Sequence, residues 1–166
     1  MDFLYDAFSF DWKLTLIDFL RVAVAFVLAI PIGWERHKSE RSLGLRTFPI
    51  VAMAACGYML IVKNVPGANA ETQARLLQGL LGGIGFIGGG AILKEGTNVR
   101  GLATASSIWC TGAIGAAVGF ERIEIALILS LITFLTLRLL TPVVEHDNYD
   151  NGENDAKKGG ENESEK

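Results

Sequence analysis

The sequence predicts an all-α membrane protein with five transmembrane helices, followed by a short polar tail. Half of the 166 residues are hydrophobic and the mean hydropathy is +0.34, although the end of the chain is strongly polar. A helix of about 20 apolar residues crosses a hydrocarbon core of roughly 30 Å. Apolar segments of suitable length therefore predict helices at about residues 14–34, 47–62, 76–93, 102–119 and 123–141, within a transmembrane domain 1–144.

Charge is divided unevenly between this domain and the end of the chain. Residues 145–166 contain eight acidic residues and three lysines, a net charge of minus five, whereas residues 1–144 carry plus two. A highly charged segment with few apolar residues cannot bury a core, so we expect residues 145–166 to form a disordered acidic tail. Because the membrane domain is only mildly basic, the charge gives no reason to expect a nucleic-acid partner.

The first expected helix, residues 14–34, holds Asp18 and Arg21, which share one helix face because they are three residues apart. An ionisable group inside a span is expensive unless it is paired or faces the protein interior. A functional intramembrane pair and a local ion pair that reaches the headgroups are therefore both open. The preceding stretch is aromatic and carries aspartates rather than a basic region, so we expect an interfacial anchor and no cleavable signal peptide.

The second and fifth expected helices carry few charges. Pro49 lies in the first turn of the helix at 47–62, where its missing N–H group removes no helical hydrogen bond. The helix at 123–141 follows a tight corner at residues 120–122, and Arg138 lies near enough to its end to reach the headgroups. We expect both segments to be ordinary spans.

Residues 76–119 contain twelve of the nineteen glycines, in two apolar arms around a polar connector. Small residues four positions apart let the backbones of two membrane helices approach closely. We therefore expect this hairpin to be the buried, tightly packed core of the bundle. The glycines expected at helix contacts are Gly79, Gly83, Gly85, Gly89, Gly112 and Gly115.

The helix at 102–119 carries Thr104, Ser107 and Thr111 on one face, at offsets of three and seven residues. Hydroxyl groups in membrane helices most often bond to the backbone or to an adjacent helix, which favours a packing role. The alternative is a polar path through the membrane lined by these hydroxyls.

Two polar connectors, at residues 35–46 and 94–101, fall on the same membrane face because two expected spans separate them. By the positive-inside rule this more basic face is cytoplasmic, which places the N-terminus outside and the C-terminus in the cytoplasm. Acidic residues add nothing to retention, so their presence beside the arginines indicates a polar site. Its candidate residues are Glu35, Arg36, Arg41, Arg46, Asn98 and Arg100.

Motifs of soluble enzymes are absent or out of context. Residues 83–88, G-I-G-F-I-G, match the dinucleotide fingerprint, but they lie inside an expected span with no acid at residues 103–109, where that fold places one. Cys56, Cys110, His37 and His146 have no ligand-like spacing. We expect no enzyme activity, no cofactor and no metal site.

Several motifs occur in order along the chain: W-E-R at 34–36, G-L-R-T at 44–47, G-I-G-F-I-G-G-G-A-I at 83–92, V-R-G-L-A-T-A at 99–105, and Trp109. In these motifs the chain resembles the MgtC/SapB family. The resemblance implies a five-helix protein of the bacterial inner membrane that is associated with adaptation to low magnesium and survival inside host cells. It also implies a short form, because longer members continue into a folded cytoplasmic domain.

Three functions stay open at this point. The resemblance implies a regulatory or adaptive partner of other membrane proteins, embedded in the lipid bilayer. The charged pair in the first helix and the hydroxyls of the fourth favour the alternative, a small transporter or channel for an ion or solute, magnesium included. The third is a structural role, in which the protein only forms a homo-oligomer.

Overall fold

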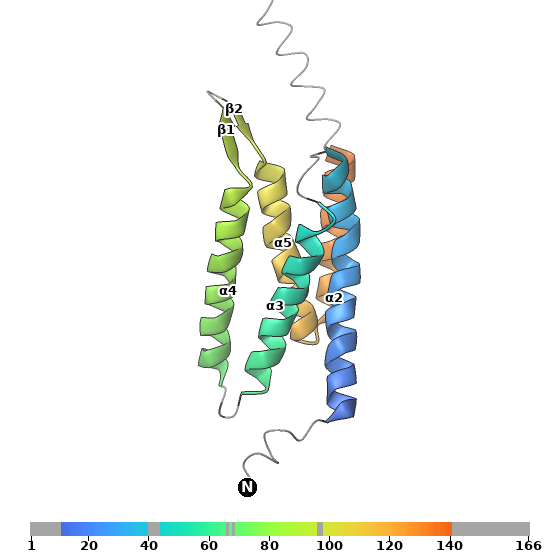
Figure 1. The fold of residues 1–166 in the computed structure, drawn as a ribbon, viewed down its shortest axis with the longest axis vertical. Helices are drawn as coiled ribbons and strands as arrows, with labels where there is room; N and C mark the ends of the chain where they lie inside the picture. Colours follow the sequence, from blue (N-terminus) through green and yellow to red (C-terminus); the bar gives the residue numbers. More distant parts are fainter. Residues whose placement is uncertain (1–10, 40–43, 66, 68, 96–97, 141–166) are drawn as a thin grey trace, which may run out of the picture.

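The structure, a computed structural model, describes residues 11–39, 44–65, 67, 69–95 and 98–140. Figure 1 shows a bundle of helices that run up and down, with a small hairpin at one end. The described residues form α2 (Trp12–Ser39), α3 (Thr47–Lys63), α4 (Ala70–Gly90), β1 (Leu93–Glu95), β2 (Asn98–Arg100), α5 (Leu102–Gly119) and a last helix, Ile123–Leu140. The expected acidic tail, residues 1–10 and Arg41 lie outside the described residues.

The predicted class, an all-helical membrane protein, is confirmed. Among the described residues, three helices are long and apolar enough to cross a membrane: Trp12–Lys38, Leu102–Gly119 and Ile123–Leu140. Helix α3 is equally apolar but shorter, with 17 residues. Helix α4 is different, because its first turns are polar and its last two turns are mostly glycine.

Two helices extend beyond the apolar segments that predicted them, because polar side chains cap their first turns. Asp11 accepts hydrogen bonds from the backbone N–H groups of Lys13 and Leu14, at 3.0 and 3.3 Å, so α2 begins at Trp12. Helix α4 begins at residue 70 rather than 76, because the Asn69 side chain accepts a hydrogen bond of 2.9 Å from the backbone N–H of Thr72. A side-chain oxygen at this position satisfies one of the unpaired N–H groups of a helix start.

The connector between α4 and α5 is an antiparallel hairpin rather than a loop. Leu93 pairs with Arg100, Lys94 with Val99, and Glu95 with Asn98. The chain then enters α5 through Gly101, which has a left-handed φ of 85°. A Cβ atom on Gly101 would collide with the carbonyl oxygen of Ala91, so only glycine fits this junction.

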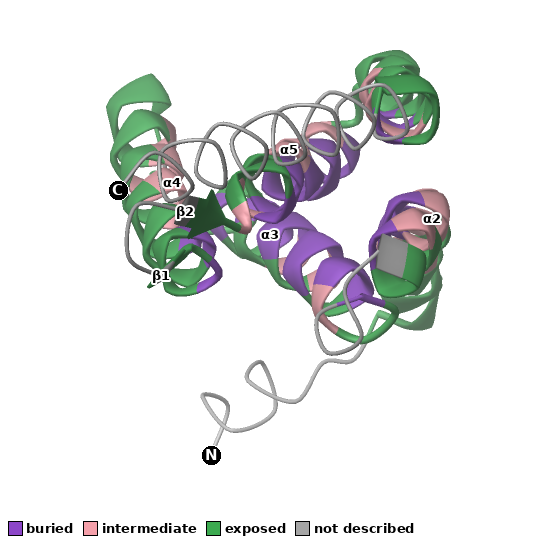
Figure 2. Cartoon of the chain, turned by 90° about the horizontal axis from the view of Figure 1, so that it is seen from above, coloured by how far each residue is buried: buried purple, intermediate pink, exposed green. Residues whose placement is uncertain are grey.

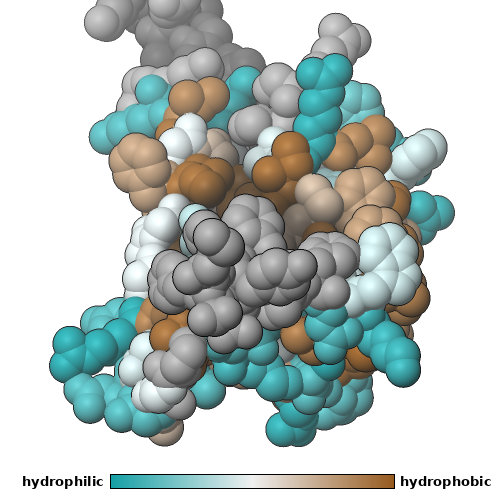
Figure 3. Space-filling view, turned by 60° about the horizontal axis from the view of Figure 1, so that its bottom comes forward, coloured by the Kyte–Doolittle hydropathy of each residue, from teal (hydrophilic) through white to brown (hydrophobic). Residues whose placement is uncertain are grey.

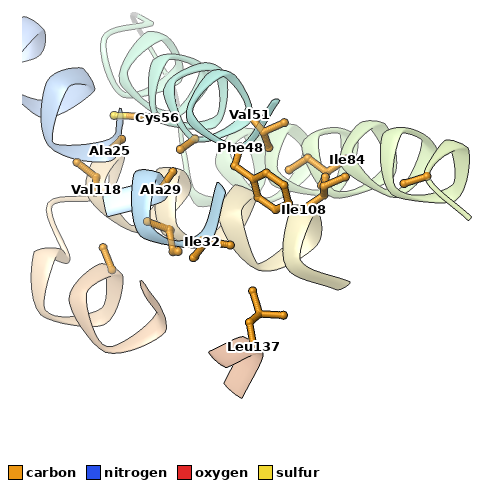
Figure 4. Close-up of a cluster of buried hydrophobic side chains, with 14 of the residues drawn as sticks. Ala25, Ala29, Ile32, Phe48, Val51, Cys56, Ile84, Ile108, Val118 and Leu137 are labelled. Atoms are coloured by element: carbon orange, nitrogen blue, oxygen red, sulfur yellow. The ribbon is translucent and has the colours of Figure 1, made fainter. Parts of the chain in front are cut away.

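The core lies around α5, which contacts α2, α3 and α4 and has its most extensive interface with α3. More than half of the α5 span is buried, and Figure 2 shows the buried surfaces of α3 and α5 facing each other in the centre of the bundle. Figure 4 shows Ile32 of α2, Phe48 of α3 and Ile108 of α5 in one hydrophobic cluster. Ser130 ties the last helix to α2 by donating a hydrogen bond of 2.7 Å to the carbonyl oxygen of Leu28.

The glycines on the two arms of the expected hairpin differ in how closely they approach another helix. On α5, a Cβ at Gly112 would overlap the Ile84 side chain of α4, and a Cβ at Gly115 would overlap the backbone of α3 at Ala52. On α4, only Gly88 approaches another helix, with its Cβ position 3.3 Å from the Ala105 carbonyl oxygen.

The expectation that both arms are buried in the core is therefore wrong for α4. This helix lies at the edge of the bundle, where only Ile84 and Gly88 are buried. Four of its glycines that were expected at helix contacts have no atom of the described chain within 4 Å of a built Cβ: Gly79, Gly83, Gly85 and Gly89. Sequence spacing predicts which residues share a helix face, but it does not decide which face meets a neighbour.

Candidate functional site

An ionic cluster joins three segments at the end of the bundle opposite the hairpin. One guanidinium nitrogen of Arg21 lies 3.0 Å from the Asp18 carboxylate, and another binds the carboxylate of Glu121. Lys63, the last residue of α3, binds the same Glu121 oxygen at 2.5 Å. The pair predicted on the first helix is therefore part of a network that links α2, α3 and the corner before the last helix.

Glu121 has an unusual backbone conformation for its residue type. Its φ is 63°, in the left-handed region where residues other than glycine are strained. The hydrogen bond from Lys63, followed by the charges of Arg21 and Lys63, lowers the pKa of the Glu121 carboxyl from its ordinary value. Figure 3, which brings this end of the molecule forward, shows hydrophilic side chains beside strongly hydrophobic ones.

Sequence reasoning did not identify Glu121, because its partners Lys63 and Arg21 are 58 and 100 residues away in the chain. The only signal was the tight corner at residues 120–122, which placed an acid and a base at a helix boundary. Nothing in the local sequence showed that this corner returns to the first helix.

Two of the three hydroxyls predicted to share a face of α5, those of Ser107 and Thr111, are buried and bonded to their own helix. Ser107 donates a hydrogen bond of 2.6 Å to the carbonyl oxygen of Ala103, and Thr111 donates one of 2.8 Å to the carbonyl oxygen of Ser107. Thr104 and Thr111 are fully buried. Their burial supports the packing role, because side chains that line a water-filled path would be exposed to that path.

The described residues of the predicted polar site belong to segments that reach the hairpin end of the bundle (Figure 1). Arg36 is buried, with 3% of its surface exposed, and Arg46 and Arg100 are exposed. The carboxylate of Glu35 lies 3.8 Å from the guanidinium of Arg138, on the last helix. Neither Arg41 nor the side chain of Asn98 is among the described parts of the chain, so a single site built from all six residues stays a prediction.

An apolar groove of about 610 Å³ separates α3 from α4. Gly79 and Gly83 form part of its α4 wall, and Ala54 and Tyr58 form part of its α3 wall. This groove explains why the two glycines contact no other helix. A smaller hollow of about 390 Å³ lies on the other side of α4, where Gly85 and Gly89 face Ser106 and Trp109 of α5.

The ionisable side chains that the structure describes do not gather as metal ligands. Within the described ranges, no group of three or more histidine, cysteine, aspartate or glutamate residues could hold one. Cys56 is a buried free thiol, and Cys110 lies 2.9 Å from the hydroxyl of Thr133.

Comparison with known proteins gives consistent matches over the helical part of the chain. The profile of the MgtC family matches residues 22–146. Protein MgtC of Brucella abortus is 39% identical over 124 residues, which cover 75% of this chain and 51% of that protein. Protein MgtC of Salmonella typhimurium is 34% identical over 129 residues, which cover 78% and 54% of the two chains.

An uncharacterized protein of Synechocystis sp. is 35% identical over 139 residues, which cover 82% of this chain and 57% of that protein. The chain therefore spans about half the length of the curated relatives it matches. No solved structure matches it.

Proposed function

We propose that this chain, which belongs to the MgtC family, is a five-helix protein of the bacterial inner membrane that regulates other membrane proteins during magnesium-related adaptation. The observation that carries this proposal is the glycine-lined groove between α3 and α4. Small residues at a membrane helix surface allow close approach of another helix, and this surface is not filled by the described helices of the chain itself. A transmembrane helix of a partner protein fits its chemistry.

The proposal includes five membrane spans and one orientation in the membrane. Helix α3 is roughly 25 Å long and α4 roughly 31 Å, at 1.5 Å per residue, so both are long enough to serve as spans beside the three more apolar helices. Five described basic residues flank the helix ends at the hairpin end, and four flank them at the opposite end, which favours a cytoplasmic hairpin and an external N-terminus. The five are Arg36, Lys38, Arg46, Lys94 and Arg100, and the four are Lys13, Lys63, Arg75 and Arg122.

The alternative, a small transporter or channel, has less support. The three hydroxyls that could line a path are buried, and the charged pair of α2 belongs to the ionic cluster. Purified protein in liposomes should therefore give no ion or solute flux that depends on Thr104 or Asp18. Flux that disappears in Thr104→Ala or Asp18→Asn would favour the transporter instead.

Two leucine substitutions on α4 test the regulatory proposal. Gly83→Leu places a large side chain in the groove, whereas Gly82→Leu places the same side chain one position away, outside the groove. Neither glycine has an atom of the described chain within 4 Å of a built Cβ, so both variants should accumulate normally in the membrane. Gly83→Leu should fail to restore growth at low magnesium in a strain that lacks the protein, while Gly82→Leu should restore it.

Equal growth of both variants at equal abundance would contradict the groove as a partner site. If Gly83→Leu lowers abundance, a milder Gly83→Val variant keeps the comparison informative. A photoreactive residue at Ile87, which also lines the groove, should form an adduct with another membrane protein in the wild-type background and lose it in Gly83→Leu.

A further inference from the structure

The basic residues at the two ends of the bundle differ in whether they form ion pairs. At the end opposite the hairpin, the chain supplies an acidic partner for four of the five described bases, Lys13 being the exception: Arg21 and Lys63 bind Glu121, and the other two pairs are Arg75 with Glu71 and Arg122 with Glu124. At the hairpin end, four exposed bases form no ion pair with any side chain that the structure describes: Lys38, Arg46, Lys94 and Arg100. We call these four residues the basic end.

The hairpin end therefore has an excess of positive charge. Its described segments carry six basic residues, the four of the basic end with Arg36 and Arg138, and two acidic residues, Glu35 and Glu95, which leaves a net charge of plus four. Residues 145–166 carry eight acids and three lysines, which is a net charge of minus five. The two charges are opposite in sign and nearly equal in size.

The described part of the chain ends close to this surface, five residues before the acidic segment begins. The last helix ends at Leu140 beside the end of α2, at the same end of the bundle as the hairpin (Figure 1). The 26 residues after Leu140 can span roughly 90 Å when extended and about 28 Å as a flexible coil. Packed helix axes lie about 8–10 Å apart, so this length is enough to cross the end of a five-helix bundle.

We propose that residues 145–166 bind the basic end of the same chain as its electrostatic counterion. Tethering gives the segment an effective concentration on the order of millimolar at this surface, which compensates for the weakness of each exposed ion pair. The segment then competes with any other anion for the same bases, including phospholipid headgroups and acidic regions of a partner protein. This inference rests on charges and positions in the structure and does not depend on the partner groove between α3 and α4.

A photocrosslinking experiment on the full chain tests the proposal. A photoreactive residue replaces Val99, whose exposed side chain lies next to Lys94 across the hairpin. The protein is reconstituted at one copy per disc in nanodiscs of uncharged phosphatidylcholine, so that adducts are intramolecular and no anionic lipid competes. We expect adducts between Val99 and peptides from residues 145–166, identified by mass spectrometry, and none from a photoreactive residue at Val65 at the opposite end.

Two matched variants keep the structure and remove the charges. Replacing the eight acids of residues 145–166 with Asn and Gln should abolish the adducts, and so should the double change Lys94→Gln and Arg100→Gln. About 1 M NaCl should abolish them as well, because the Debye length falls to about 3 Å.

The absence of Val99 adducts to residues 145–166 in uncharged discs would overturn the proposal. It would also be overturned if the neutralised segment gave the same yield as the wild type, because proximity would then not depend on charge. If discs that contain anionic phosphatidylglycerol gave lipid adducts while uncharged discs gave none to the segment, the lipid headgroups would be the counterion instead.

Discussion

The close contact between α3 and α5 should be highly sensitive to one added methyl group. Gly115 lies where α5 crosses α3, and a built Cβ at this position is 2.9 Å from the Ala55 Cβ and closer still to the Ala52 carbonyl oxygen. The obstructing atoms include backbone, which cannot turn away as a flexible side chain can. Gly115→Ala therefore requires α3 and α5 to move apart, and overpacking of this kind typically costs about 1–3 kcal/mol.

Gly82→Ala on α4 is the matched control, because its new methyl group meets no atom of the described chain within 4 Å. Both changes carry the same intrinsic gain in helix propensity, about 1 kcal/mol, so this term cancels when the variants are compared. We expect Gly115→Ala to be less stable than Gly82→Ala by about 1–3 kcal/mol, or about 5- to 150-fold in the folding equilibrium.

Unfolding in mixed detergent micelles with increasing sodium dodecyl sulfate, followed by circular dichroism, measures this difference. Equal unfolding midpoints for the two variants would refute the close approach of α3 and α5. If Gly82→Ala were less stable than the wild type, the placement of α4 at the edge of the bundle would be refuted.

Three further predictions address the ionic cluster, the hairpin junction and the topology. Because Lys63 and Arg21 lower the Glu121 pKa from 4.5, the folded state gains stability above the unfolded-state pKa and loses it as pH falls through the folded-state pKa. The melting temperature of the wild type should therefore fall more steeply on acidification than that of Glu121→Gln, and parallel curves would contradict the ion pairs. Gly101→Ala should sharply reduce the yield of monodisperse protein in size-exclusion chromatography, because the new methyl group strains a left-handed residue and collides with the Ala91 carbonyl oxygen. A normal elution profile of this variant would contradict the tight fit at the junction. A reporter that is active only in the periplasm should be silent when fused at residue 145 and active when inserted after Gly67; the opposite pattern would reverse the proposed orientation.

Much of the helical architecture could be predicted from the sequence, because the hydropathy of a short segment indicates whether that segment forms a membrane helix. The apolar run at 102–119 has the same bounds as α5, and the segment predicted at 123–141 ends one residue beyond the observed helix. The family motifs are also local, so the resemblance they predicted is confirmed by the family match over residues 22–146. The polar extension of α4 was missed because hydropathy ignores a cap such as Asn69.

Only the tertiary structure decided which surfaces meet. The same glycine spacing occurs on α4 and α5, yet Gly112 and Gly115 face other helices while Gly79 and Gly83 line an open groove. The Arg21 side chain likewise finds Glu121 across the bundle, at a distance of 100 residues in sequence. Spacing along one helix determines which residues share a face, whereas the rotation and neighbours of that helix depend on the simultaneous packing of all the helices.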